Sequence, residues 1–346
     1  MKAFVLRRTG EVAVIAKSVP EPGPHEVVVR ITAALLCASD VRGARRGLPA
    51  GPDTTLGHEA VGVVHALGSE VTGLYVGQRV AVGGGGPHSV SDGSLAEYVL
   101  VPCPAGHPDG HDAHDALNAP GTPDTTQAPR TAPAPQTTPA RETLTPVPDA
   151  VSDHQALYAT GPLSGGFAAA ERAELRPGHP VAVLGQGAVG LSTTIAARLG
   201  GAGPIIAVES RIRRQKLALH FGADVVVDPA YEDTVERIME LTGGTGVDVA
   251  IEAVGADVRP DAADTARRIV SRGGRIVHAG CAADTGPEGA RTGRILRLIE
   301  SGQIRPTAMT THAFDFDRVE RAYELLAGRA DGIIKPLIVF PPPGAG

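Results

Sequence analysis

Aromatic residues are scarce in this sequence, and tryptophan is absent. Phenylalanine and tyrosine together make up 3% of its 346 residues, which argues against a platform on which bases or sugars stack. Cysteine is scarce too, because Cys37, Cys103 and Cys281 are too few for a disulfide framework. A reducing, cytoplasmic environment is therefore expected.

The sequence also lacks an excess of positive charge and lacks long apolar runs. Its formal net charge is −6, so nucleic acids and anionic membranes are not expected as partners. No apolar run is long enough to cross a bilayer, and the first residues do not form a signal-like segment. With 42% hydrophobic and 20% charged residues, the composition is typical of a soluble globular protein with two domains.

The first part of the chain, residues 1–155, predicts a small β domain. Short apolar runs such as 27–31, 60–64 and 78–82 are separated by glycine and proline turns, a pattern typical of a closed or nearly closed barrel. Between 103 and 143 the composition shifts to proline, threonine, alanine, histidine and aspartate without an apolar period. That segment is interpreted as a disordered insertion.

Strand-like and helix-like segments alternate in residues 156–304, which predicts a doubly wound parallel sheet of the α/β class. Strands are expected at 180–184, 205–208, 225–227, 247–251 and 275–277, and helices at 191–199, 211–221, 231–242 and 260–271.

The last segment, residues 305–346, is expected to rejoin the β domain. A helix is predicted over 317–328 and a closing strand over 333–339, where Pro336 favours a sheet edge or a bulge. His312 and Lys335 in this segment are interpreted as structural or surface residues.

A glycine-rich turn separates the first predicted strand of the parallel sheet from its helix. The glycines of this turn allow a close approach to a pyrophosphate, which the N-terminus of the helix also attracts. Glu209 ends the next strand, where a carboxylate accepts hydrogen bonds from ribose hydroxyls. The pattern predicts a dinucleotide site, and the alternative is an ordinary turn between a strand and a helix. The residues of the predicted site are Gly185, Gly187, Ala188, Val189, Gly190, Glu209, Ser210 and Arg211.

A second group of residues that can carry chemistry lies in the predicted β domain. The segments Cys37-Ala38-Ser39-Asp40 and Gly57-His58-Glu59 offer a thiolate, an imidazole and carboxylates. These are the ligand types that hold a catalytic zinc ion with one position left for water or substrate. Each residue alone has an ordinary structural interpretation. Together, and beside a dinucleotide fold, they suggest a metal-assisted hydride-transfer site.

These motifs resemble the medium-chain dehydrogenase/reductase superfamily, in its zinc-dependent alcohol dehydrogenase branch. The resemblance implies a GroES-like β-barrel catalytic domain beside a Rossmann domain, and hydride transfer between an alcohol carbon and NAD(P). It implies that Cys37 and His58 are zinc ligands and that Glu59 matches an acid able to ligate the metal. It further implies that Ser39 is the proton-relay hydroxyl and that Asp40 orients His58.

The sequence departs from the family pattern in three places. Gly161 stands where a cysteine, aspartate or glutamate usually supplies a third zinc ligand, so the protein ligands are expected to be Cys37, His58 and Glu59. The segment 83–91 contains no cysteine for a structural zinc lobe. The segment 280–293 is shorter than in relatives, which use that region to form a dimer, so a homo-oligomer of that kind is in doubt.

Cofactor choice depends on Glu209 and the residues after it. The carboxylate repels a 2′-phosphate and favours NAD, whereas relatives that use NADP place a serine and an arginine, here Ser210 and Arg211, around that phosphate. We favour NAD on the repulsion by Glu209.

Three functions therefore stay open at this point. The leading one is a zinc-dependent dehydrogenase acting on a small-molecule alcohol, polyol or its carbonyl counterpart. The second is a zinc-free, NADPH-dependent quinone or enoyl-type reductase of the same superfamily. The third is a nucleotide-binding homologue with impaired catalysis.

Overall fold

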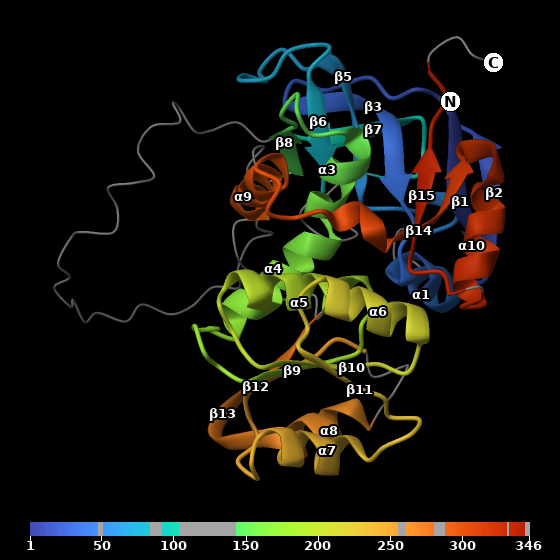
Figure 1. Cartoon of the computed structure of the whole chain (residues 1–346). Helices are drawn as coiled ribbons and strands as arrows, with labels where there is room; N and C mark the ends of the chain where they lie inside the picture. Colours follow the sequence, from blue (N-terminus) through green and yellow to red (C-terminus); the bar gives the residue numbers. More distant parts are fainter. Residues whose placement is uncertain are drawn as a thin grey trace, which may run out of the picture.

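The computed structural model contains two lobes that lie one above the other (Figure 1). The upper lobe is rich in β-strands and contains the N-terminus, and the lower lobe is built on a parallel sheet. The structure describes residues 1–47, 51–83, 92–103, 143–254, 261–279, 288–330 and 332–342. The interior of the predicted insertion, Cys281 and the first part of the short 280–293 segment lie outside these residues. Among the described residues, no helix has the length and apolar character needed to cross a membrane.

The β lobe contains two sheets. The smaller has the strand order β2 (Glu11–Ala16), β1 (Lys2–Arg8), β4 (Thr54–Thr55). The larger has the order β14 (Thr310–Asp315), β15 (Lys335–Val339), β3 (Glu26–Leu35), β5 (Ala60–Leu67), β6 (Arg79–Val82), β8 (Leu144–Pro146), and β7 (Tyr98–Pro102) also pairs with β3. An isolated bridge between Ala3 and Ala96 joins β1 to the segment before β7. The strands therefore wrap around a common apolar interior, which includes Phe4, Val29, Ile31, Val64 and Leu95.

The lower lobe is a parallel sheet with helices on both faces, as the alternating pattern predicts. Its order is β11 (Val225–Val227), β10 (Ile205–Val208), β9 (Val181–Leu184), β12 (Val247–Glu252), β13 (Val270–His278). In Figure 1, α5 (Ala188–Leu199) and α6 (Ile212–His220) lie on the face toward the β lobe, and α7 (Thr234–Leu241) and α8 (Ala262–Ile269) lie on the other. The four strand residues of β9 are fully buried, as expected for a central strand covered on both faces.

Several boundaries in this lobe differ from their predictions, and the largest difference lies between α8 and β13. The helix expected through residue 271 ends at Ile269, and β13 begins directly at Val270. Val270 pairs with Val247 of the neighbouring strand, so pairing with the sheet takes these residues out of the helix. The prediction of helix for residues 270 and 271 is wrong.

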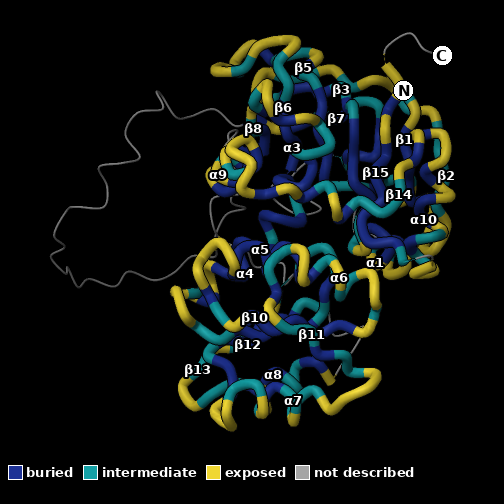
Figure 2. Tube along the Cα trace, in the orientation of Figure 1, coloured by how far each residue is buried: buried dark blue, intermediate teal, exposed yellow. Residues whose placement is uncertain are grey.

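Helices α3 (Asp153–Thr160) and α4 (Pro162–Arg172) connect the two lobes. A single cluster of buried apolar residues runs through them, from Leu35 and Val61 in the β lobe through Tyr158 and Leu163 to Leu191 at the parallel sheet. Most of the tube through this region is dark, and therefore buried, in Figure 2. The lobes are therefore joined by shared packing rather than by a bare linker.

The chain returns to the β lobe through α9 (Glu288–Glu300), the short 3-10 helices η2 (Pro306–Met309) and η3 (Phe316–Arg318), and α10 (Val319–Ala327). The last strand, β15, inserts between β14 and β3. Pro336 is therefore not on an edge, and the register between β14 and β15 shifts beside it. Pro336 was predicted to lie at a sheet edge or at a bulge, and the shifted register agrees with the bulge.

Candidate metal and dinucleotide site

A cleft of about 750 Å³ lies between the two lobes. Cys37 and Lys335 line it from the β lobe, and Gly185, Gly187 and Glu209 line it from the parallel sheet. The carboxyl ends of β9 and β10 open into the cleft, which is where ligands bind in open α/β sheets. Of the candidate metal ligands Cys37 lines this cleft, so the cysteine loop and the glycine-rich turn border one space.

The ends of two paired strands bring the candidate metal ligands together. Strands β3 and β5 are antiparallel, with Ala34 opposite Ala60, so the residue that follows β3 lies near the residue that precedes β5. Cys37 caps α1 (Ala38–Arg46) just after β3. His58 follows Gly57, whose φ of +93° suits glycine and whose added Cβ would lie 2.7 Å from a Leu95 side-chain carbon.

Cys37, His58 and Glu59 each offer one ligand atom, and these atoms all lie within 4.8 Å of one another. His58 Nε2 lies 3.3 Å from the hydroxyl of Ser39 and 3.8 Å from Glu59 Oε1. The opposite ring nitrogen, Nδ1, lies 3.3 Å from Asp40 Oδ1. Sulfur, nitrogen and oxygen donors thus converge from one face, which is the donor set of a zinc site.

Asp40 fixes the local backbone as well as the imidazole. Its Oδ2 accepts a hydrogen bond of 2.7 Å from the backbone N–H of Cys37, and its Oδ1 accepts one of 3.2 Å from the N–H of Gly57. One carboxylate therefore ties the cysteine loop to the histidine loop and orients the His58 ring.

The charges at this site stabilise one another. Burial alone would raise the pKa of the Cys37 thiol, but the positive charge of Lys335 and a hydrogen bond with His58 lower that pKa to about 7. Burial also opposes a charge on His58, yet the Asp40 carboxylate raises the pKa of the imidazole well above its usual value. A thiolate is therefore accessible at Cys37 near neutral pH, as metal ligation requires.

Gly161, between α3 and α4, lies directly against Glu59. A Cβ added at Gly161 would overlap the carboxyl group of Glu59 and would lie 2.6 Å from its Cγ. The Glu59 carboxylate thus fills the space in which a side chain at position 161 would begin. Glu59, which directly precedes β5, therefore places a carboxylate where position 161 has no side chain.

Lys335 is the residue at this site that the sequence interpretation missed. Its side chain is 2% exposed, and its ammonium donates a hydrogen bond to Glu59 Oε2. Of the two interpretations of Lys335, structural or surface, the surface one is wrong. A lysine inside the apolar segment 333–339 was the available signal, because a buried ammonium needs a partner.

The glycine-rich turn has the geometry that its sequence predicts. Gly185 has a φ of +87°, and a Cβ there would lie 2.6 Å from Val254 Cγ2. A Cβ on Gly190 would overlap the carbonyl of Gly185. Gly187 caps α5, whose first residues, Ala188 and Val189, also line the cleft. Gly190 is buried behind them, so its role is to let the helix pack against the turn.

Glu209 is buried at the end of β10 and holds the turn together. Its carboxylate accepts hydrogen bonds from the backbone N–H groups of Gln186, Ser210 and Arg211, at 3.0, 2.9 and 3.0 Å. The guanidinium of Arg214 lies 3.8 Å from it. Ser210 and Arg211 line the cleft beside it, so this end of the cleft contains charges of both signs.

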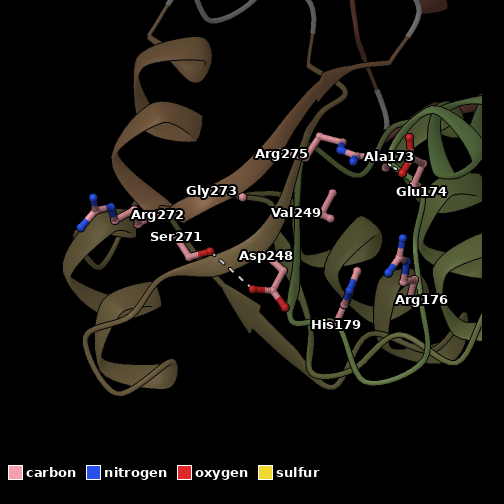
Figure 3. Close-up of a pocket in the computed structure, with 11 residues that line it drawn as sticks. Ala173, Glu174, Arg176, His179, Asp248, Val249, Ser271, Arg272, Gly273 and Arg275 are labelled. Carbon is pink, nitrogen blue, oxygen red and sulfur yellow. Dashed lines mark hydrogen bonds and ion pairs between the residues drawn. The ribbon is translucent and has the colours of Figure 1, made fainter.

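A second hollow, of about 350 Å³, lies at the amino ends of β9, β12 and β13 (Figure 3). It contains an ion pair between Arg275 and Glu174 at 2.9 Å, and the Ser271 hydroxyl donates a hydrogen bond to Asp248 at 3.4 Å. The glycine-rich turn and the cluster around Cys37 do not line it. The cleft between the lobes is therefore the candidate site.

A dinucleotide fold and a sulfur–nitrogen–oxygen cluster on one cleft define the class of this protein as a nicotinamide-nucleotide-dependent oxidoreductase. Residues 23–107 match the alcohol dehydrogenase GroES-like domain, and residues 188–327 match the domain described as zinc-binding dehydrogenase. The chain belongs to the zinc-dependent alcohol dehydrogenase branch of the medium-chain dehydrogenase/reductase superfamily. The predicted fold class and enzyme class are confirmed.

Individual relatives agree with this assignment. The chain is 34% identical over 365 residues to an alcohol dehydrogenase of Cupriavidus necator, and the match covers 97% of each chain. It is 31% identical to an NADP-dependent isopropanol dehydrogenase of Thermoanaerobacter brockii, over 98% of this chain and 100% of that one. Among solved structures, a zinc-dependent alcohol dehydrogenase 2 from Streptococcus pneumoniae superposes with a TM-score of 0.79 at 25% identity, with both chains fully covered.

Proposed function

We propose that this protein oxidises a small or medium alcohol or polyol to its aldehyde or ketone, with zinc held by Cys37, His58 and Glu59 and with NAD in the cleft. The observation that carries the proposal is the convergence of the three donor atoms within 4.8 Å. The overlap between the Glu59 carboxylate and the side-chain space of Gly161 supports Glu59 as the third ligand.

The residues present fit a zinc ion. Thiolate, imidazole and carboxylate are the donors that zinc prefers, and catalytic sites use three of them. The pKa of the Cys37 thiol, lowered to about 7 by Lys335 and His58 against the effect of burial, favours the ligating form. Zinc bound there would supply a Lewis acid that lowers the pKa of an alcohol, and the nicotinamide would supply the hydride acceptor.

The chain itself positions the substrate and moves a proton. The oxidation removes one proton from the hydroxyl oxygen and one hydride from the adjacent carbon, which leaves a carbonyl. Ser39 Oγ lies beside the donor cluster, 3.3 Å from His58 Nε2, and a hydroxyl can accept the alcohol proton while it donates its own. Ser39 is therefore the proposed proton relay toward the cleft.

NAD is the proposed cofactor. The ionised Glu209, with three backbone N–H donors, offers its remaining acceptor capacity to a ribose hydroxyl and repels a 2′-phosphate. The nearby Arg211 and Arg214 act in the opposite direction. The NADP-dependent isopropanol dehydrogenase among the relatives makes NADP the alternative to be tested.

The remaining expectations are part of the same proposal. The partner is a small-molecule alcohol or carbonyl, and the scarcity of cysteine supports a cytoplasmic location. The catalytic domain is proposed to consist of residues 1–155 and 305–346, and the nucleotide domain of residues 156–304.

Metal analysis and a substrate panel test this function. We expect about one zinc ion per chain, because a catalytic site of this type holds one metal, and a higher kcat/KM with NAD than with NADP for alcohol oxidation. Metal content is measured on the purified protein after dialysis. Zinc-free protein that oxidises NADPH with quinones or enones would support the reductase instead. Nucleotide binding without turnover on any substrate would support the impaired homologue.

Replacing Asp40 by asparagine tests the orientation of His58. The amide keeps the shape but loses the charge that fixes the imidazole, so we expect the zinc affinity to fall roughly 10- to 100-fold. The measurement is competition with a chromophoric chelator. Asp53, an exposed acid of the same lobe that pairs with Arg7 at 2.8 Å, gives the matched control Asp53→Asn, which should retain its zinc. Equal zinc affinities in the two variants contradict the proposed role of Asp40.

A further inference from the structure

The two carboxylate oxygens of Glu59 have different neighbours. Oε2 accepts the hydrogen bond from the Lys335 ammonium. Oε1 lies 3.8 Å from His58 Nε2 and borders the space above Gly161. One oxygen is therefore engaged by a cation, and the other faces the cluster of donor atoms.

Lys335 is held firmly in this place by the sheet. It begins β15, the strand between β14 and β3, and the carbonyl of the next residue, Pro336, accepts a hydrogen bond of 3.2 Å from the N–H of Leu36. Leu36 immediately precedes Cys37, so the backbone that supports the lysine also supports the thiol. Both partners of the ion pair are nearly inaccessible, with side-chain exposures of 2% for Lys335 and 4% for Glu59.

The number of oxygens that Glu59 gives to a metal decides how many positions are left for substrate. A carboxylate can bind a metal through one oxygen or through both. A catalytic zinc site keeps one position open beside three protein ligands. Two oxygens from Glu59 would add a fourth protein donor atom and close that position.

We propose that Lys335 is a positioning residue that keeps Glu59 a one-oxygen ligand and so leaves a metal position open for the alcohol. This inference rests on the proposed zinc site. Position 161 supplies no side chain, so Glu59 has to provide the third ligand, and Lys335 limits it to one donor atom. A purely structural ion pair would stabilise the fold without affecting metal geometry.

Cobalt substitution tests this proposal, because the visible absorption of Co²⁺ reports its coordination number and its thiolate ligand. Zinc is exchanged for Co²⁺ in the full-length wild type, in Lys335→Met and in Lys335→Arg, which keeps the charge and the donor. Trifluoroethanol, an alcohol that resists oxidation, is then added as the probe. Metal content and circular dichroism are measured on the same samples.

We expect one Co²⁺ per chain in all three proteins. The wild type and Lys335→Arg should show the intense bands of four-coordinate cobalt, and trifluoroethanol should shift these bands. In Lys335→Met four protein donor atoms, two of them from Glu59, would fill the coordination sphere, so the bands should be shifted from their wild-type positions and trifluoroethanol should leave them unchanged. A wild-type spectrum with a wild-type alcohol response in Lys335→Met overturns the proposal.

Two further results have definite meanings. If Lys335→Met does not fold, Lys335→Gln replaces it, because a neutral amide holds the carboxylate oxygen less strongly than an ammonium. A partial loss of the response to trifluoroethanol then supports the proposal, and a wild-type spectrum with a wild-type response overturns it. If the wild type itself shows no thiolate-to-cobalt band, the proposed zinc site is wrong, and this failure is visible without any variant.

Discussion

Replacement of Cys37 by alanine is expected to remove the zinc ion and to lower kcat/KM for alcohol oxidation by roughly a thousandfold. The reason is that a Lewis acid contributes several kcal/mol of transition-state stabilisation, and only His58 and Glu59 would remain to hold it. Zinc per chain and initial rates with NAD are the measurements.

Cys103 provides the matched control for this experiment. It is a free cysteine of the same lobe and is 3% exposed. Its backbone N–H donates a hydrogen bond to the carbonyl of His25, and it does not line the cleft. Burial raises the pKa of its thiol to about 11, so it resembles an inert core residue. Cys103→Ala should keep both zinc and activity. A Cys37→Ala protein that keeps both would refute the metal site.

Replacement of Gly161 by alanine is expected to reduce the zinc affinity roughly 10- to 100-fold, although alanine adds only one methyl group. That methyl group would occupy the volume of the Glu59 carboxylate, so Glu59 has to move away from His58. Chelator competition measures the affinity, and kcat/KM should fall with it.

Gly165 in α4, the helix that follows Gly161, gives the control. A Cβ there would lie 3.8 Å from Val189 Cγ2, an ordinary contact, so Gly165→Ala should bind zinc like the wild type. A rescue is available as well. In a Glu59→Ala background, Gly161→Asp should bind zinc more tightly than Gly161→Ala, because it returns a carboxylate to the same space. If Gly161→Ala binds zinc normally, Glu59 does not fill the place of the third ligand.

The features that local sequence determines were predictable. Alternating apolar segments of strand and helix length predict the parallel sheet. The glycines predict the tight turn, because a positive φ at residue 185 and close contacts at residues 185 and 190 require glycine there. The proximity of Cys37 to His58 was suggested only by residue type. It depends on the pairing of β3 with β5, which no local pattern specifies.

The arrangement around Glu59 could not be predicted from the sequence. Glu59 and Lys335 are separated by 276 positions, and their contact exists because the last strand inserts between β14 and β3. The glycine at 161 led to the expectation that Glu59 is the third ligand, but the close approach of the Glu59 carboxylate to Gly161 depends on how the segment between α3 and α4 packs against the β lobe. The start of β13 was mispredicted for a similar reason, since sheet pairing at Val270 overrode a helical pattern.

The place of β15 in the sheet has a consequence for biogenesis. The strand that contains Lys335 is synthesised after the other strands that the structure describes, yet it lies between two of them, β14 and β3. Domains generally begin to fold from the N-terminal side during translation. A nascent chain that has not yet reached β15 therefore contains Cys37, His58 and Glu59 without the ammonium that pairs with Glu59.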